Sequence, residues 1–258
     1  MNSLANLFHS LTENNPSELP SNWLQGRTAY GGFSSALALK IAVDANKSDN
    51  RILRSAQVAF IGPITSNVKF MPEILRVGKS ATYICVKGIT DNSTVIMATF
   101  IFGNDRESQI NHNYITAPSA FKPDTYSELP DTLLVPDFFK NFNVRIISDS
   151  LFFSGGPKPE LIAWVKFKEN QKIIDELALL LIADSLPPAS TVCFKDIAPI
   201  SSMDWSFKIV NAHISTEWLL LRSNSLISNH GYSFQEMQLW NDKGELMMIG
   251  TQNVAIFG

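Results

Sequence analysis

Asp184 has the clearest chemical potential in the chain, because it ends the most apolar run of the sequence. Seven apolar residues from Leu177 to Ala183 precede it, and the pair Pro187–Pro188 follows shortly after. The macrodipole at the C-terminus of a helix disfavours a carboxylate. A buried carboxylate without partners is costly or changes its pKa. Asp184 therefore either bonds the following turn or acts as a reactive group.

A second candidate is the pair Gly31–Gly32, which opens an apolar segment. Glycine relieves steric crowding where a tight loop enters a helix. Backbone N–H groups at a helix N-terminus can also bind an oxyanion or polarise a carbonyl. The sequence is consistent with both interpretations.

The elements that must position these residues follow the same order twice, a helix and then strands. In the first half we expect a helix over 32–47 and strands over 54–62, 68–76, 81–89 and 94–103. In the second half we expect opening strands within 142–153 and 161–168, a helix over 172–185, and strands over 204–210, 217–224, 232–240 and 246–257. Both helices are apolar nearly all round, so each must be wrapped. Two curved antiparallel sheets can do this and can merge, which leaves no unpaired edge at their join.

The polar segment 104–139 separates the halves and is punctuated by Pro118, Pro123, Pro130 and Pro136. This composition is typical of a linker that runs over the surface. The predicted division is an N-terminal unit over 1–103, a linker over 104–140 and a C-terminal unit over 141–258. Short matches such as 55-SAQVAF-60 with 202-SMDWSF-207 support a repeat.

Composition excludes several classes of protein. The net charge is −3 and the basic residues are scattered, so nucleic acid is not an expected partner. No apolar run approaches the ~20 residues that span a bilayer. The N-terminal stretch lacks the pattern of a secretory signal, and we expect a cytoplasmic protein. Cys85 and Cys193 are expected to be buried, reduced thiols.

The sequence contains no familiar catalytic or metal-binding motif. The segment 76-RVGKS-80 lacks the first glycine of a phosphate-binding loop and lies between predicted strands. No G-x-S-x-G, HExxH or paired CxxC motif is present, so neither a serine nucleophile elbow nor a metal site is expected. The four histidines stand alone in polar segments and are predicted to lie at the surface: His9, His112, His213 and His230.

Several segments together resemble one family over nearly the whole chain. They are 23-WLQGRTAYGGFSSALALKIA-42, 54-RSAQVAFIGPITSNVKFMPEILRVGKSATYICV-86, 183-ADSLPPA-189, 201-SSMDWSF-207 and 231-GYSFQEMQLWNDKGELMMIGTQNVAIF-257. They are similar to the double-hotdog acyl-CoA thioesterases, closest to the type II branch. The resemblance implies an α+β fold of two repeats, each with a long apolar central helix wrapped by a curved antiparallel sheet.

The resemblance also implies a catalytic set, which falls on Asp184, Ser202 and Gln252. Asp184 would be the general base that takes a proton from water, and Ser202 and Gln252 would hold that water for attack on the thioester. Ser201 adjoins Ser202 and is an alternative source of the hydroxyl. The segment Tyr30, Gly31, Gly32 and Phe33 would bind the substrate or its oxyanion. Asp204, which opens a strand, is expected to be structural.

Acyl-CoA is the implied partner, and Arg54, Arg76 and Lys79 are candidate contacts for its phosphates by charge alone. No cofactor or metal is implied. Members of the family often assemble through their sheets, so the resemblance allows a homo-oligomer and leaves the oligomeric state open. Two other functions stay open: a hotdog hydratase or dehydratase, which would use a histidine, and an acyl or acyl-CoA binder without catalysis. The second would follow if Asp184, Ser202 and Gln252 did not converge.

Overall fold

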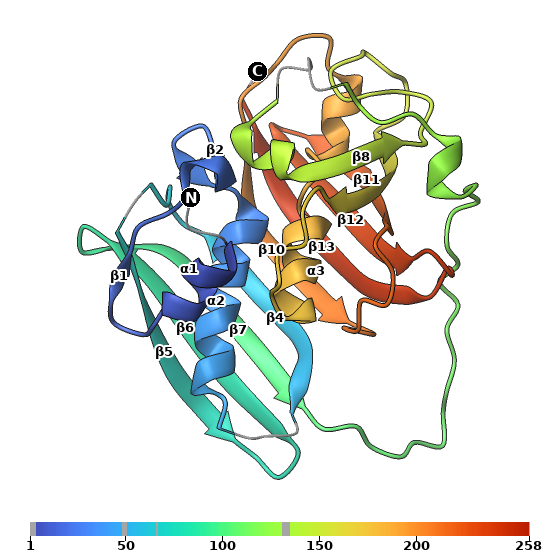
Figure 1. The fold of residues 1–258 in the computed structure, drawn as a ribbon. Helices are drawn as coiled ribbons and strands as arrows, with labels where there is room; N and C mark the ends of the chain where they lie inside the picture. The colour runs from blue at the N-terminus through green and yellow to red at the C-terminus, as the bar shows by residue number, and fades with distance from the viewer. Residues whose placement is uncertain (1–3, 48–50, 66, 131–134, 258) are drawn as a thin grey trace.

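The computed structural model describes residues 4–47, 51–65, 67–130 and 135–257. Its centre is one antiparallel sheet of eleven strands in the order β1-β5-β6-β7-β4-β10-β13-β12-β11-β9-β8 (Figure 1). The strands are β1 (Pro16–Ser17), β4 (Ile52–Phe60), β5 (Val68–Val77), β6 (Ala81–Thr90), β7 (Ser93–Gly103), β8 (Phe142–Ile146), β9 (Glu160–Phe167), β10 (Ile200–Ile209), β11 (Leu219–Asn229), β12 (Tyr232–Asn241) and β13 (Leu246–Ile256). A separate ribbon pairs β2 (Leu24–Gln25) with β3 (Thr28–Ala29).

The two halves join through β4 and β10, which pair antiparallel with Trp205 opposite Val58 and Phe207 opposite Ala56. These are the strands whose sequences 55–60 and 202–207 match. The expected merging of two sheets is therefore confirmed. The hairpin predicted at 90–93 also forms, because Asp91 and Asn92 both adopt the positive φ that a tight β-turn requires.

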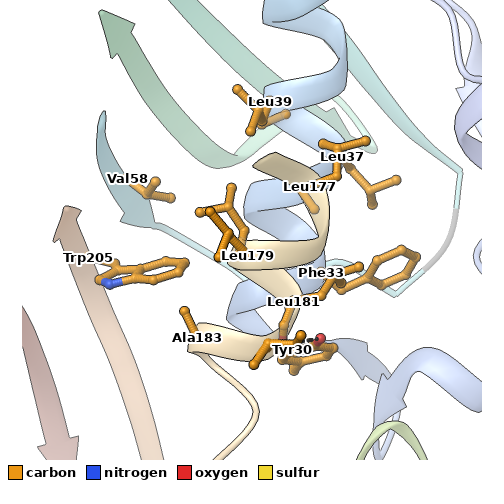
Figure 2. Close-up of a cluster of buried hydrophobic side chains, with 14 of the residues drawn as sticks. Tyr30, Phe33, Leu37, Leu39, Val58, Leu177, Leu179, Leu181, Ala183 and Trp205 are labelled. Atoms are coloured by element: carbon orange, nitrogen blue, oxygen red, sulfur yellow. Dashed lines mark hydrogen bonds between the residues drawn. The ribbon is translucent and has the colours of Figure 1, made fainter. Parts of the chain in front are cut away.

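The structure has three α-helices among its described residues: α1 (Leu4–Ser10), α2 (Gly31–Ala45) and α3 (Asp175–Ala183). Helices α2 and α3 lie side by side on the inner face of the sheet (Figure 1). Figure 2 shows Leu177 and Leu181 of α3 on the side of α2, whereas Leu179 and Ala183 lie toward Trp205 of β10. The apolar pattern on all sides of both helices is explained by this position between the sheet and a second helix.

The prediction of a long central helix in the second repeat was wrong, because α3 has nine residues rather than the fourteen of 172–185. Lys172 has φ +50, which is incompatible with a right-handed helix there. At the other end, Asp184 leaves the helical region with φ −106 and ψ 21. Pro187 then prevents the helix from resuming.

Three further expectations were wrong or incomplete. The strand expected over 142–153 stops at Ile146, and Phe153 has φ +58, which a strand cannot accommodate. Helix α1 was not predicted; Phe8 of this helix packs edge-on against Phe33 of α2. Cys85 is buried as expected, but Cys193 is exposed because the 3₁₀ helix Ala189–Cys193 turns it outward.

The segment between the halves does more than connect them. Its side chains Ile115, Ala117, Ala120 and Tyr126 pack over a cluster on the outer face of the second half of the sheet, formed by Trp164, Leu220, Trp240 and Leu246. Trp164 Nε1 donates a hydrogen bond to the carbonyl oxygen of Phe121 at 3.1 Å. Although the segment is polar in composition, its scattered apolar residues cover this cluster on the outer face of the sheet.

Candidate active site

Asp184 lies where the C-terminus of α3 meets the N-terminus of α2. The backbone N–H of Gly32 donates to Asp184 Oδ2 at 2.6 Å, and Gln252 Nε2 donates to Asp184 Oδ1 at 2.7 Å. The carboxylate thus bonds an N–H group at the positive end of the α2 dipole, which offsets its unfavourable place at the end of α3. Three segments far apart in the sequence meet at one side chain.

Gly31 and Gly32 are needed for this close approach. A Cβ atom at Gly31 would lie 2.7 Å from Asp184 Oδ2. At Gly32 it would lie 2.7 Å from the carbonyl oxygen of Leu180 and 3.0 Å from Asp184 Cβ. Only residues without a side chain let α2 begin against the end of α3. The bond from Gly32 also occupies one of the N–H groups that the sequence suggested for an oxyanion.

The environment raises the pKa of Asp184 to about 6. Burial is the largest cause, since it removes water from the charged form, and the hydrogen bonds from Gln252 and Gly32 act in the opposite direction. Part of the side chain remains accessible, but desolvation outweighs the two bonds. A carboxylate with this pKa is charged at neutral pH and is a stronger base than an ordinary aspartate, which suits general-base catalysis.

Gln252 extends from β13, opposite Gln235 of β12 on one side and Trp205 of β10 on the other. Its Nε2 donates to the carboxylate, which fixes the orientation of the amide. Gln252 Oε1 makes no hydrogen bond within the described part of the chain, so it remains an acceptor for a third group.

Asp184 and Gln252 line a small cavity of about 20 Å³, which has room for about one water molecule. We call it the Asp184 cavity. It is lined by Ala183, Asp184, Leu186, Pro187, Pro188, Leu221, Ser223, Gln235, Glu236, Met237 and Gln252. The lining thus combines polar side chains, among them Asp184, Gln235 and Gln252, with aliphatic ones.

Ser202 lies on β10 next to this site but does not line the cavity. A β-bulge at Met203 places Ser202 opposite Val254, on the same side of the sheet as Gln252. Its hydroxyl forms no hydrogen bond to Asp184 or Gln252. Ser201 is opposite the next residue, Ala255, and is exposed. The alternation of the strand therefore favours Ser202 over Ser201 as a neighbour of Gln252.

Asp204 has partners away from the cavity. It accepts hydrogen bonds from the backbone N–H of Asn253 at 3.3 Å and from Asn253 Nδ2 at 2.8 Å. These contacts secure the β10–β13 pairing just after the bulge. The structure thus supports the interpretation of Asp204 as a structural residue.

Tyr30 and Phe33 lie in the core rather than along the Asp184 cavity. The Tyr30 hydroxyl donates to the carbonyl oxygen of Leu181 at 3.0 Å, and its ring stacks on Phe138 at 4.0 Å between centroids. Burial, followed by the nearby charge of Asp184, raises the pKa of Tyr30. Tyr30 is therefore a neutral donor that ties the start of α2 to the end of α3.

The three basic residues considered for the CoA phosphates gather at the opposite end of the sheet. Arg54 forms an ion pair with Asp105 and donates to the carbonyl oxygen of Gly103. Arg76 and Lys79 are exposed near the turn between β5 and β6. Arg54 is six residues from Phe60, whose ring is close to Gly31, so about 20 Å of strand separates this group from the Asp184 cavity.

The histidines do not contribute to the cavity. His213 contacts Asp175 at 3.2 Å near the start of α3, with most of its side chain exposed. None of the four lines the cavity. No group of three or more metal-binding side chains occurs within the described ranges, and no helix in them is long and apolar enough to cross a membrane.

Gln235 is the residue at this site that the sequence reasoning missed. It is 3% exposed, and the backbone N–H of Ala189 donates to its Oε1 at 2.5 Å. A signal for it existed in the sequence. In strand β12, Ser233, Gln235, Met237 and Leu239 alternate with residues of the other face, and the apolar members identify that face as the buried one. An amide there needs partners.

The architecture is α+β and is similar to that of hotdog-fold proteins. It is similar to a hotdog-fold protein of unknown function from Alicyclobacillus acidocaldarius, with a TM-score of 0.85, 21% identity and coverage of 93% of this chain and 92% of that chain. A candidate thioesterase II from Thermobifida fusca has a TM-score of 0.82 and 19% identity, with 97% of each chain covered. An acyl-CoA thioesterase II from Mycobacterium marinum has a TM-score of 0.73 and 17% identity, with 88% of this chain and 89% of that chain covered. At these identities the likeness shows the fold.

The family follows from the sequence itself. The acyl-CoA thioesterase N-terminal domain model matches residues 19–103, and the corresponding C-terminal domain model matches residues 117–256. The chain therefore belongs to the acyl-CoA thioesterase family, which confirms the resemblance. No curated protein sequence matches it significantly.

Proposed function

We propose that this protein hydrolyses an acyl-CoA thioester to a free acid and CoA, with Asp184 as the general base. The observation that carries the proposal is the Asp184 cavity, where a carboxylate of raised pKa and the free Oε1 of Gln252 adjoin space for one water molecule. Membership of the thioesterase family agrees with this reaction.

The chemistry assigns a separate task to each group. Water in the cavity donates one hydrogen bond to Asp184 and another to Gln252 Oε1, and these bonds aim its lone pair at the thioester carbonyl carbon. Ser202 is on the same side of the sheet as Gln252 but does not line the cavity, so Asp184 and Gln252 carry this arrangement. The water oxygen bonds the carbonyl carbon as one proton passes to Asp184. The C–S bond of the resulting intermediate then breaks, and the CoA thiolate takes that proton from Asp184. A thiol has a pKa near 8.5, so it leaves without strong acid assistance.

The experiment that tests this function is release of free thiol from a panel of short, medium, long and aromatic acyl-CoAs. We expect hydrolysis of at least one member, and the panel then identifies the acyl class. Acyl-CoA binding without thiol release would instead support the alternative function, a non-catalytic acyl-CoA-binding protein. A hydratase or dehydratase finds less support, because no histidine lines the cavity.

Replacing Gln252 with methionine tests its place in the site. Loss of the hydrogen bond to Asp184 Oδ1 removes an interaction that favours the charged carboxylate, so we expect the apparent pKa of the reaction to rise further above 6. Loss of a water-positioning group is also expected to lower kcat by roughly 10²-fold.

The matched control is Gln57→Met, since Gln57 is an exposed glutamine on strand β4 of the same sheet. It should leave the pH profile of hydrolysis unchanged. An unchanged profile and rate for Gln252→Met would remove Gln252 from the mechanism.

We place the reaction in the cytoplasm, where the free thiols of Cys85 and Cys193 would remain reduced. We also propose that copies of the chain associate through the sheet, whose first half exposes Met71, Tyr83 and Met97.

A further inference from the structure

The amide of Gln235 has a fixed orientation beside the Asp184 cavity. Its Oε1 accepts the backbone N–H of Ala189, so the oxygen must face that residue and Nε2 must point away from it. Gln235 Nε2 is buried and has no hydrogen-bond partner in the described structure. Buried amide donors are rarely left unpaired, so this one indicates a ligand atom that accepts its proton.

Gln235 and Gln252 are directly opposite each other on β12 and β13, so their side chains share one face of the sheet and both line the cavity. Their amides present opposite chemistry. Gln252 uses Nε2 to bond Asp184 and leaves an oxygen acceptor, whereas Gln235 uses its oxygen to bond Ala189 and leaves an N–H donor. An attacking water needs acceptors for its protons, and a thioester carbonyl needs a donor.

One of the backbone donors that the sequence suggested for the carbonyl is already occupied. Gly32 N–H is bonded to Asp184 at 2.6 Å. Among the side chains that line the cavity, the buried N–H donor without a partner is that of Gln235. Gln235 lines the same small space as Asp184, and a fixed N–H donor at such a space is the kind of group that oxyanion stabilisation requires.

We propose that Gln235 is a further catalytic residue, which donates Nε2–H to the thioester carbonyl oxygen and stabilises the oxyanion. This inference rests on the proposed function. In the step, the water oxygen bonds the carbonyl carbon, its proton passes to Asp184, and the carbonyl π electrons move to the oxygen held by Gln235. Collapse of the intermediate breaks the C–S bond, releasing the acid and the CoA thiolate, which recovers the proton from Asp184.

Two variants separate the donor from the contact with Ala189. Gln235→Glu keeps an oxygen for the Ala189 N–H and has no donor once its carboxyl group is ionised, whereas Gln235→Met removes both groups at every pH. The control is Gln238→Glu, the same change on the other face of β12. On the high-pH plateau we expect kcat to fall by roughly 10²–10³-fold in both variants, with KM little changed and the control unaffected. Wild-type kcat in either folded variant would overturn the proposal.

A second measurement does not depend on hydrolysis. A ¹³C-labelled ketone analogue of acyl-CoA, with methylene in place of sulfur, is bound and its carbonyl stretch is recorded. We expect a lower frequency in the wild type than in Gln235→Glu, because the donor polarises the carbonyl. Equal frequencies, or no binding to the wild type, would overturn the proposal. A Gln235-dependent shift without hydrolysis of any acyl-CoA would uphold the donor and refute the proposed function.

Discussion

Asp184→Asn is expected to reduce kcat for thioester hydrolysis by about 10²–10⁴-fold, the range for loss of a general base. The geometry can survive the change. Asparagine Oδ1 can accept the Gly32 N–H, and its Nδ2 can donate to Gln252 Oε1 after rotation of that amide. The fall in kcat would then be due to the missing base and not to a disrupted site. The rate of thiol release measures it, and retention of more than about a tenth of the wild-type rate would exclude Asp184 as the base.

The same variant is expected to be more stable than the wild type at pH 8. The folded-state pKa of Asp184, about 6, lies above its ordinary value of 3.8. The folded protein therefore binds the Asp184 proton more tightly than the unfolded chain does. The free energy of unfolding consequently falls as the pH rises from about 4 to 6. At 1.36 kcal/mol per pKa unit the loss is about 3 kcal/mol above pH 6, and asparagine avoids it. The free energy of unfolding at pH 8 and at pH 4 should show the gain at pH 8 alone.

Gly32→Ala is expected to damage both the fold and the site. The new Cβ would lie 2.7 Å from the carbonyl oxygen of Leu180, which belongs to the backbone of α3 and cannot rotate away. Separating α2 from α3 should cost about 1–3 kcal/mol, as overpacking a core does. It should also lengthen the bond from Gly32 to Asp184 and lower kcat by roughly 10²-fold, since small misplacement of reacting groups has effects of this size.

Gly62→Ala is the matched control for this change. A Cβ at Gly62 would meet Val95 Cγ1 at 3.5 Å, which is ordinary van der Waals contact. Denaturant unfolding and thiol release should distinguish the two variants. If Gly32→Ala were as stable and as active as Gly62→Ala, the close packing of α2 against Asp184 would not be required.

The strands and the pairing of the two halves were predictable because their signals are local. Alternation and turn residues place β5, β6, β7 and β12 within a few positions of the expected ranges. The length of α3 was not predictable from the sequence, because the apolar pattern continues through residues whose backbone conformation ends the helix. The covering role of 104–130 was also missed, since isolated apolar residues in a polar segment show no period.

The candidate site was also predictable only in part, because local sequence signals do not report contacts between distant segments. The bond between Gln252 and Asp184 joins residues that the family resemblance selected, but their contact depends on how β13 and α3 pack. The hydrogen bond from the Gly32 N–H to Asp184 forms because the start of α2 lies against the end of α3, and no local sequence pattern predicts that contact. Gln235 had a signal in its strand, and only the position of Ala189 shows which way its amide faces.

The most direct test of the central claim, that the Asp184 carboxylate activates the water, is kcat/KM against pH for the wild type beside Asp184→Asn. The account predicts that the wild-type value rises with pH through a single ionisation near 6 and then stays level. The residual activity of the variant should lack that ionisation. If Asp184→Asn kept the wild-type profile, another group would control the reaction, and Asp184 would be only the cap that joins α2 to α3.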